Sequence, residues 1–431
     1  MFQTLRNAWK IPDLRKKILY TILMLIIFRL GSFIPVPGIS PEMIAGMMGG
    51  FEGGIQGLIN NFSGGALERA SIFSMSITPY INASIILQLL TVAIPALERL
   101  SKEGEEGRKK IASYTRYLTV VLAFVQATGL YFGLKGLMTE TGVFEYLVVT
   151  FTFTAGTAFL MWLGEQITDR GIGNGISLLI VIGIVSRIPT AITSMSGMIQ
   201  QNGNLNITNI VTIIAVLVIA IVAIGFVVLF NEAERKIPVQ YAKRVVGRKT
   251  YGGQSTHIPM KVIMAGVMPI IFAVSIMSFP RTISMFIHGS NAPVDGVWGT
   301  LLRWFSETHP FYIVCYFLLI LFFTYFYTAI QFNPIEVANN IKRNNGSIPG
   351  IRPGKPTSDY IAKVLSKTTL LGAFFLGIIA IFPLLMAFVP SMPAGVTIGG
   401  TSLLIVVGVS LETVKNIESQ MLMRHYKGFL E

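Results

Sequence analysis

The feature that most constrains this chain is a series of ten long apolar stretches separated by polar gaps. A helix needs about 20 mostly apolar residues to cross the roughly 30 Å hydrocarbon core of a bilayer. Hydrophobic residues make up 52% of the chain and charged residues only 13%. The pattern predicts an all-α polytopic membrane protein with ten transmembrane helices. The predicted spans are Ile18–Val36, Ile72–Pro95, Tyr117–Leu134, Tyr146–Gly164, Ile172–Ser186, Asn209–Phe230, Val262–Pro280, Phe311–Phe332, Thr369–Pro390 and Val396–Leu411.

The distribution of basic residues predicts the orientation of these spans. Most of the 34 Lys and Arg residues lie in the two terminal segments or in the gaps after even-numbered spans. Basic residues near span ends stay in the cytoplasm, so we expect both termini there. Topology and anionic lipid heads explain most of the net charge of +13 without a nucleic-acid partner. Two long cytoplasmic loops, about 231–261 and 333–368, carry more basic residues than orientation alone requires.

The sequence lacks the residues that several classes of protein require for their function. Cys315 is the only cysteine and the four histidines are scattered, so we expect no internal disulfide, no metal site and no cofactor. The glycine-rich run Gly171–Ser177 joins two apolar helices and lacks a following GK[ST], which favours a tight cytoplasmic turn over a nucleotide loop. The spans also lack a Ser–His pair or paired aspartates, so an intramembrane enzyme is disfavoured. The first apolar run is followed by Pro35 and Pro37 instead of a small-residue cleavage site, and we expect it to be retained.

A weak internal similarity divides the chain into two halves, 1–200 and 201–431. Pro79 in the second span and Pro269 in the seventh are each followed by apolar residues, Ala and Ser. Five spans per half would invert the second half, and such repeats commonly place a translocation path at their interface. The alternative is coincidence, because proline is common in membrane helices. A secondary transporter with the same repeat would need intramembrane carboxylates or His, whereas Arg29 is the only clear ionisable residue within the spans.

Several long motifs, in the same order, carry a resemblance to a known family. The chain resembles the SecY family over essentially its whole length, and members of this family form the central subunit of the bacterial Sec protein-conducting channel. The resemblance implies ten helices around an hourglass pore that passes unfolded secretory proteins and releases membrane-protein helices laterally into the bacterial plasma membrane. It implies as partners the SecE and SecG subunits, the SecA ATPase motor, the ribosome with its nascent chain, signal peptides and membrane lipids. The motifs are FRLGSFIPVPGI (Phe28–Ile39), FSGGALERASIFSMSITPYINASIILQLL (Phe62–Leu90), DRGIGNGISL (Asp169–Leu178), YAKRVVGRKTYGGQSTHIPMKVIMAGVMPIIFA (Tyr241–Ala273) and GIRPGKPT (Gly350–Thr357).

The resemblance also assigns a gate within the membrane. A narrow ring of aliphatic side chains can exclude ions by dewetting. Each such residue taken alone is better explained by ordinary lipid-facing or core packing, and only the family resemblance favours the ring. A half-helix before the second span would act as a plug, and the alternative is a helix on the membrane surface. Polar contacts at a lateral gate contribute only about 0.6–2 kcal/mol, which suits a seam that must open. By similarity, the pore ring is Ile77, Ile81, Ile180, Ile271 and Ile405, with Met268 as a candidate sixth member; the plug is Phe62, Ser63, Gly64, Gly65, Ala66, Leu67, Glu68, Arg69, Ala70, Ser71, Ile72 and Phe73; and the lateral gate includes Asn82, Gln126 and Phe279.

The two long loops are interpreted as a docking surface for the motor and the ribosome. Prolines and glycines surround Arg352 and limit the freedom of its loop, and a rigidly displayed Arg suits phosphate and carboxylate recognition. The alternative is a solvated loop that only sets topology. The docking residues implied by the resemblance are Lys243, Arg244, Arg248, Lys249 and Arg352.

Overall fold

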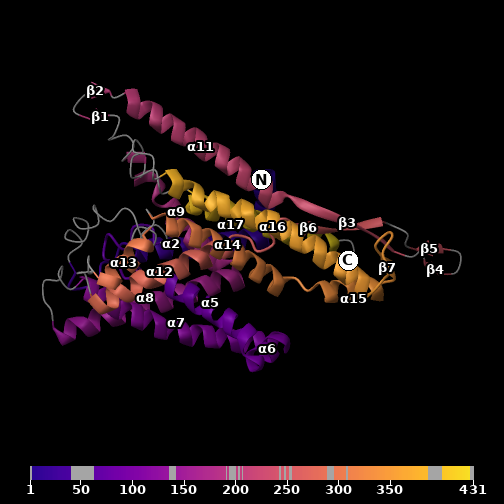
Figure 1. The fold of residues 1–431 in the computed structure, drawn as a ribbon, viewed down its shortest axis with the longest axis horizontal. Coiled ribbons are helices and arrows are strands. Elements are labelled where there is room, and N and C mark those ends of the chain that lie inside the picture. Colours follow the sequence, from indigo (N-terminus) through magenta and orange to yellow (C-terminus); the bar gives the residue numbers. More distant parts are fainter. Residues whose placement is uncertain are drawn as a thin grey trace.

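The computed structural model of the chain is mostly helical (Figure 1). It describes residues 2–39, 63–134, 142–190, 192–193, 200–201, 204–205, 207–241, 244–246, 249–251, 255–288, 296–306, 309–386 and 400–427. The helices are α1 (Phe2–Lys10), α2 (Pro12–Gly31), α5 (Thr78–Ala93), α6 (Pro95–Lys102), α7 (Glu105–Leu134), α8 (Val143–Arg170), α9 (Gly175–Val185), α11 (Ile207–Glu232), α12 (Met268–His288), α13 (Gly296–Trp304), α14 (Pro310–Gln331), α15 (Pro334–Arg343), α16 (Lys355–Met386) and α17 (Gly400–Lys427).

Proline and side-chain caps set many of the helix starts. A proline occupies the first or second position of α2, α5, α6, α14 and α15, where its missing N–H costs no helical hydrogen bond. The Asn174 side chain caps α9 by accepting from the backbone N–H groups of Ile176 and Ser177. Pro95 also separates α5 from α6, and the two helices are bent by 101° there. These local signals explain why long apolar runs break into the observed elements.

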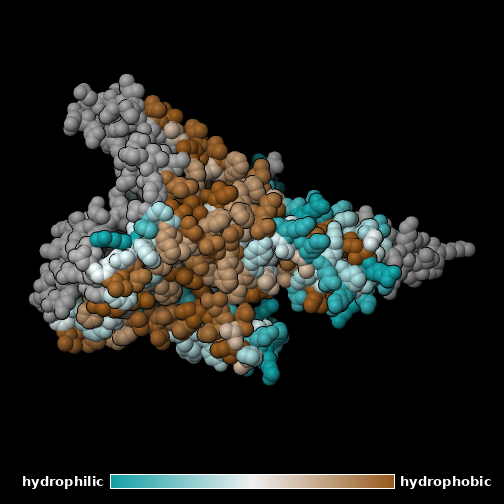
Figure 2. Space-filling view, in the orientation of Figure 1, coloured by the Kyte–Doolittle hydropathy of each residue, from teal (hydrophilic) through white to brown (hydrophobic). Residues whose placement is uncertain are grey.

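Several helices have the length and composition of membrane spans. In the part of the chain that the structure describes, four helices pass this test, and a fifth span results if the bent pair α5–α6 counts as one. Figure 2 shows an apolar band over the middle of the molecule and a hydrophilic end beyond it. The protein is therefore integral to a membrane. The four spans are Val143–Arg170, Ile213–Glu232, Pro310–Arg343 and Lys355–Phe382.

The helices of the two halves pack into one bundle around a shared apolar core. In the first half α5 packs on α7 and α7 packs on α8, while in the second α14 packs on both α12 and α16. Contacts of α12 with α5 and α7, and of α9 with α17, join the two halves. Helix α11 runs along one edge of the bundle against α17 (Figure 1). The largest buried cluster draws on α2, α5, α8, α9, α11, α12, α14, α16 and α17.

The two long loops form one module at the hydrophilic end, which we call the loop module (residues 234–261 and 334–365). Its sheet has the order β6-β3-β7, built from β3 (Glu234–Tyr241), β6 (Ser255–Lys261) and β7 (Gly346–Ser347). The strands are antiparallel, with Ile237 opposite Ile258 and Gln240 opposite Ser347. Two short hairpins complete the described strands: β1 (Gln200–Gln201) with β2 (Asn204–Leu205), and β4 (Arg244–Val246) with β5 (Lys249–Tyr251).

The segment before α5 corrects one expectation. The sequence predicts a half-helix here, but residues 63–77 form successive turns. Gly64 and Gly65 have φ of +67° and +80°, and Ala70 and Ser76 have φ of +46° and +53°. Left-handed residues interrupt a right-handed helix, so the many helix-capable side chains between them do not form one. We call residues 63–77 the turn segment.

Candidate functional site

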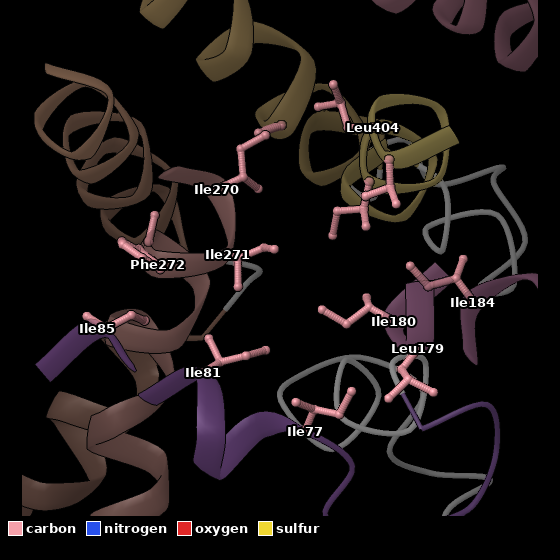
Figure 3. Packing of buried hydrophobic residues seen from close by; sticks show 14 of the residues in the cluster. Ile77, Ile81, Ile85, Leu179, Ile180, Ile184, Ile270, Ile271, Phe272 and Leu404 are labelled. Atoms are coloured by element: carbon pink, nitrogen blue, oxygen red, sulfur yellow. The ribbon is translucent and has the colours of Figure 1, made fainter. Parts of the chain in front are cut away.

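The isoleucines assigned to the ring lie in the largest buried cluster. Figure 3 shows Ile81, Ile180 and Ile271 directed toward one another from α5, α9 and α12, with Ile77 nearby at the start of α5. Ile405 comes from α17, and Met268 packs against the cluster from α12. The five isoleucines are between 1% and 8% exposed. The structure thus gathers aliphatic side chains from both halves of the chain at one place.

Local structure fixes the directions of these side chains. Ile77 and Ile81 are four residues apart, which places both on one face of α5, and the Ile81 N–H donates to the Ile77 carbonyl at 3.0 Å. Helix α9 lies close to α8 at Gly175. A Cβ at this position would collide with the backbone carbonyl of Gly164, so only glycine permits the contact. That close approach places Ile180 in the cluster. The preceding residues 171–174 form the tight turn that the sequence predicts.

The turn segment is packed against this cluster at its carboxy-terminal end. The Phe73 ring stacks between Phe28 of α2 and Phe159 of α8, with ring centroids 6.0 and 5.9 Å apart. A Cβ on Gly31 would overlap the Phe73 ring, and a Cβ on Gly156 would overlap the carbonyl oxygen of Ile72. Two glycines on two helices therefore form a socket that holds the end of the segment.

The amino-terminal end of the turn segment is held by polar groups. Arg29 Nη1 donates to the Gly64 carbonyl at 3.0 Å and to Ser186 Oγ at 3.2 Å. Arg187 Nη2 pairs with Glu68 Oε1 at 3.2 Å. Sequence reasoning singled out Arg29 as the one clear charge within a span but assigned it no role. Its contacts show that it joins α2, the turn segment and the end of α9.

A second pair of contacts surrounds the ring of Phe33, just after α2. The guanidinium carbons of Arg29 and Arg69 lie 4.8 and 4.4 Å from the centre of that ring. Each contact is a cation–π interaction, which is stronger where water is excluded. Two positively charged side chains, one from α2 and one from the turn segment, therefore contact the same Phe33 ring.

The three residues assigned to the lateral gate lie on α5, α7 and α12. Asn82 is buried, Gln126 is half-buried and Phe279 is exposed. Helix α12 packs against both α5 and α7. The Asn82 Oδ1 is buried without a hydrogen-bond partner among the described residues. The structure records no bond that joins these three side chains to each other within its described ranges.

Three of the residues assigned to docking, Arg244, Lys249 and Arg352, are described by the structure and belong to the two long loops. Arg352 is exposed, in a turn flanked by Gly350 and Gly354 at φ of +78° and +104°. Thr357 Oγ1 donates to the Arg352 carbonyl at 2.8 Å, which ties the turn to the start of α16. The backbone around Arg352 is therefore fixed while its guanidinium faces outward. Of the other assigned residues, Arg244 and Lys249 lie in the small hairpin β4–β5, and Lys243 and Arg248, like Phe62 of the plug, lie outside the described residues.

An ion pair joins α7 to α8 toward the α6 end of the bundle. Arg116 Nε lies 2.7 Å from Glu165 Oε1. The hydrogen bond to Glu165 raises the pKa of Arg116 above its ordinary value, so the arginine stays charged at any physiological pH. Among the described residues, no three His, Cys, Asp or Glu side chains gather as they would to hold a metal ion.

Comparison with known proteins extends these observations. The family model described as SecY matches residues 71–414. The chain is 49% identical to the protein translocase subunit SecY of Halalkalibacterium halodurans and 46% identical to that of Bacillus subtilis, and each match covers 100% of both chains.

Three solved structures share the fold. A protein-conducting channel matches with a TM-score of 0.67 at 18% identity. A SecY protein, whose plug domain stabilises the closed state of the translocation channel and maintains a membrane seal, matches with 0.65 at 18%. Sec61 in the canine ribosome–channel complex matches with 0.63 at 16%. Each alignment covers 94% of this chain and 92% of the other.

Proposed function

This chain belongs to the SecY family, and on that premise we propose that it passes unfolded secretory proteins across the plasma membrane and releases membrane-protein helices laterally into it. It is a channel subunit of a protein translocase and not an enzyme. The observation that carries the mechanism is the convergence of Ile77, Ile81, Ile180, Ile271 and Ile405 from both halves. Met268 adds a flexible side chain beside them.

The ring is the constriction of the channel. Branched aliphatic side chains bind no passing residue strongly, and a narrow apolar passage excludes ions by dewetting. A polypeptide can push such side chains apart, and they close again because burial of their apolar surface is favourable, by about 25 cal/mol per Å². Selective conduction of a chain therefore needs no charged group at the ring.

Residues 62–73 are the plug that seals the ring, although residues 63–73 form turns and not a half-helix. Its small buried residues Ser63, Ala66 and Ser71 permit close packing that can be released. Arg29 and Phe73 hold its two ends. The lateral gate is the seam of α12 with α5 and α7, near Asn82, Gln126 and Phe279.

The full architecture is ten transmembrane helices in two inverted halves, 1–200 and 201–431. Each predicted span overlaps one helix, in the order α2, α5, α7, α8, α9, α11, α12, α14, α16 and α17. Matching helix positions in the two halves support the repeat: Pro79 and Pro269 are each the second residue of their helices, α5 and α12. Ile81 and Ile271 follow these prolines by the same interval.

Both termini face the cytoplasm. Ala8 of α1, Ile172 of the α8–α9 turn and Ile417 of α17 share one small buried cluster, and Lys17 Nζ donates to Gln420 Oε1 at 3.2 Å. The two ends of the chain and an even-numbered gap therefore lie on one side. The basic residues of these segments assign that side to the cytoplasm.

The partners follow from family membership and from the loop module. The module is the docking surface for the ribosome and the SecA motor, through Lys243, Arg244, Arg248, Lys249 and Arg352. The canine Sec61 structure is a ribosome–channel complex, which supports the first of these partners. SecE and SecG complete the membrane complex, and signal peptides, nascent chains and lipids are the other ligands.

Reconstitution tests this function. Vesicles that contain the chain with its partner subunits should take up a secretory precursor when the motor and ATP are supplied. Uptake of a small solute coupled to ions would instead indicate a transporter, and cleavage of the precursor within the membrane would indicate a protease. Protection of the imported precursor from external protease, lost on addition of detergent, is the readout.

A further inference from the structure

We propose that α13 is an interfacial helix, with its exposed apolar face at the boundary between the headgroups and the acyl chains of the outer lipid leaflet. We call that face the outer stripe, and its residues are Val297, Trp298, Leu301 and Trp304. The inference assigns a lipid-binding surface that the channel function does not require. Only the word outer rests on the proposed orientation of the chain.

Helix α13 lies on the side of the membrane away from the loop module. Helix α14 is a membrane span whose carboxy-terminal end leads into α15 of that module. Its amino-terminal end, at Pro310, therefore lies across the membrane from the module, and α13 ends shortly before it. Figure 1 shows α13 and the loop module at opposite ends of the molecule.

Helix α13 is too short to cross the membrane, and one of its sides is packed on protein. Its nine residues extend about 14 Å at 1.5 Å per residue, about half of the roughly 30 Å hydrocarbon core. The helix contacts both α12 and α14. Gly299 is buried, Leu302 is half-buried, and Phe305 just after the helix packs against the largest buried cluster. The helix is therefore held in place at the ends of two longer helices.

The rest of the helix surface is divided into an apolar and a polar face. Val297, Leu301 and Trp304 recur at intervals of four and three residues, so they share one face, and all three are exposed, Val297 most at 79%. The polar face carries Thr300 and Arg303, which are also exposed. An apolar face beside a polar one is what a helix needs to lie in the plane of the membrane interface.

The outer stripe continues onto the surface of α14. The rings of Trp304 and Phe311 are in contact, with centroids 5.5 Å apart. Phe311 is 39% exposed, and Val314 and Leu318 follow it at intervals of three and four residues, each 57% exposed. On a membrane span, exposed apolar side chains of this kind meet the acyl chains of lipids. The lipid-facing surface of α14 thus reaches α13 without a break, and this continuity selects lipid as the occupant of the stripe.

Tryptophan suits the depth at which the stripe would lie. Trp is enriched at membrane–water interfaces, because its ring is apolar while its N–H seeks a hydrogen-bond partner. Two of the four tryptophans of the chain lie within the nine residues of α13. A protein partner fits less well, since the exposed parts of four side chains fall short of the roughly 800 Å² per partner of a standard interface.

Fluorescence quenching by lipids tests this surface. The complete complex is reconstituted into vesicles with channel variants that keep only Trp304 or only Trp162, the other three tryptophans being replaced by Phe. The signal of a complex whose channel subunit lacks Trp is subtracted. Trp162 is the matched control, because it is 47% exposed against 46% for Trp304 and lies within the span α8. The quenchers are phospholipids brominated near the headgroup end or near the methyl end of the acyl chains, and aqueous iodide on both sides of the membrane.

We expect the ratio of shallow to deep bromine quenching to be higher for Trp304 than for Trp162. Iodide should quench Trp304 in part and Trp162 less. Quenching of Trp304 by iodide alone would show that the stripe lies in water, and protection from both bromine and iodide would show that a protein covers it. Either result overturns the proposal and leaves the channel function in place.

Charged substitutions test the two faces separately in the variant that keeps Trp304. Val297→Asp with Leu301→Asp should lift the stripe out of the lipid, so bromine quenching of Trp304 falls and iodide quenching rises. Thr300→Asp, on the polar face of the same helix, is the matched control and should change neither. If the double aspartate variant does not assemble, serine at both positions should give a smaller shift in the same direction. An equal response of the stripe variant and the Thr300 control would overturn the outer stripe as the lipid contact.

Discussion

Ile81 of α5 and Ile271 of α12 lie in one buried cluster, and each follows by two residues the proline at the second position of its helix. One side chain comes from each half of the chain, and both are directed into the same space (Figure 3). A proline at the second helical position, followed two residues later by isoleucine, thus precedes both side chains of this contact region.

A constriction lined by polar side chains should let ions pass through the closed channel. Replacing Ile81 and Ile271 together by Asn should raise resting ion flux by about tenfold, since water wets a polar constriction and about 1.4 kcal/mol of lost preference for the closed state suffices. Ion flux from vesicles with matched amounts of channel is the measurement. Ile221→Asn on the exposed face of α11 is the control. Equal flux in the ring variant and the control would contradict the assignment of the ring.

Phe73 should matter for stability more than the rest of the plug. Phe73→Ala should lower the free energy of unfolding by about 3–5 kcal/mol, because it leaves a cavity between two stacked rings. Deletion of residues 63–69 should leave the fold intact and raise the leak. Thermal unfolding in detergent compares these variants with Phe144→Ala, an exposed residue of α8. A parental melting temperature for Phe73→Ala would refute the socket.

The small size of Gly156 should be essential. Gly156→Ala places a methyl group against the carbonyl of Ile72, a backbone atom that cannot move aside, and should destabilise the protein by about 1–3 kcal/mol. Gly225→Ala on α11 meets nothing within 4 Å and should be neutral or slightly stabilising. The same unfolding assay compares the two. Similar melting temperatures would show that the socket adapts to the added methyl group.

Arg352 should act in docking and not in topology. Arg352→Glu should leave membrane insertion intact and reduce SecA-driven import strongly, since reversal of an anchor charge costs about 2–5 kcal/mol when its partner stays buried. Arg352→Lys should restore import only in part, because Lys lacks the planar fork. Lys363→Glu, exposed on the same module, is the matched control. Import by Arg352→Glu at the rate of Lys363→Glu would show that Arg352 is not the anchor.

The apolar pattern predicts the described helices well, because long apolar runs have few alternatives in a membrane. The isoleucines assigned to the ring share one buried cluster, and their role as a ring stays a prediction. The strands of the loop module were not predicted. The buried residues Ile237 and Val239 alternate with exposed residues in β3. The partner strand β7 lies more than a hundred residues away in the sequence, and local patterns do not reveal distant pairing. The prediction of a half-helix before α5 was wrong for a similar reason. Ala70 and Ser76 adopt left-handed angles that only their tertiary contacts impose.

The loop module is connected to α12 and packs against α16, two helices that contribute to the largest buried cluster. Strand β6 ends at Lys261, seven residues before α12 begins, and Val262 lies so close to α16 that a Cβ on Gly372 would collide with its carbonyl. The module shares buried residues with the start of α16, including Ile361 and Leu365. The described contacts thus join the module to the helix that carries Ile271. Under the proposed docking role, a partner that tilts the module would shift this helix without a ligand entering the membrane.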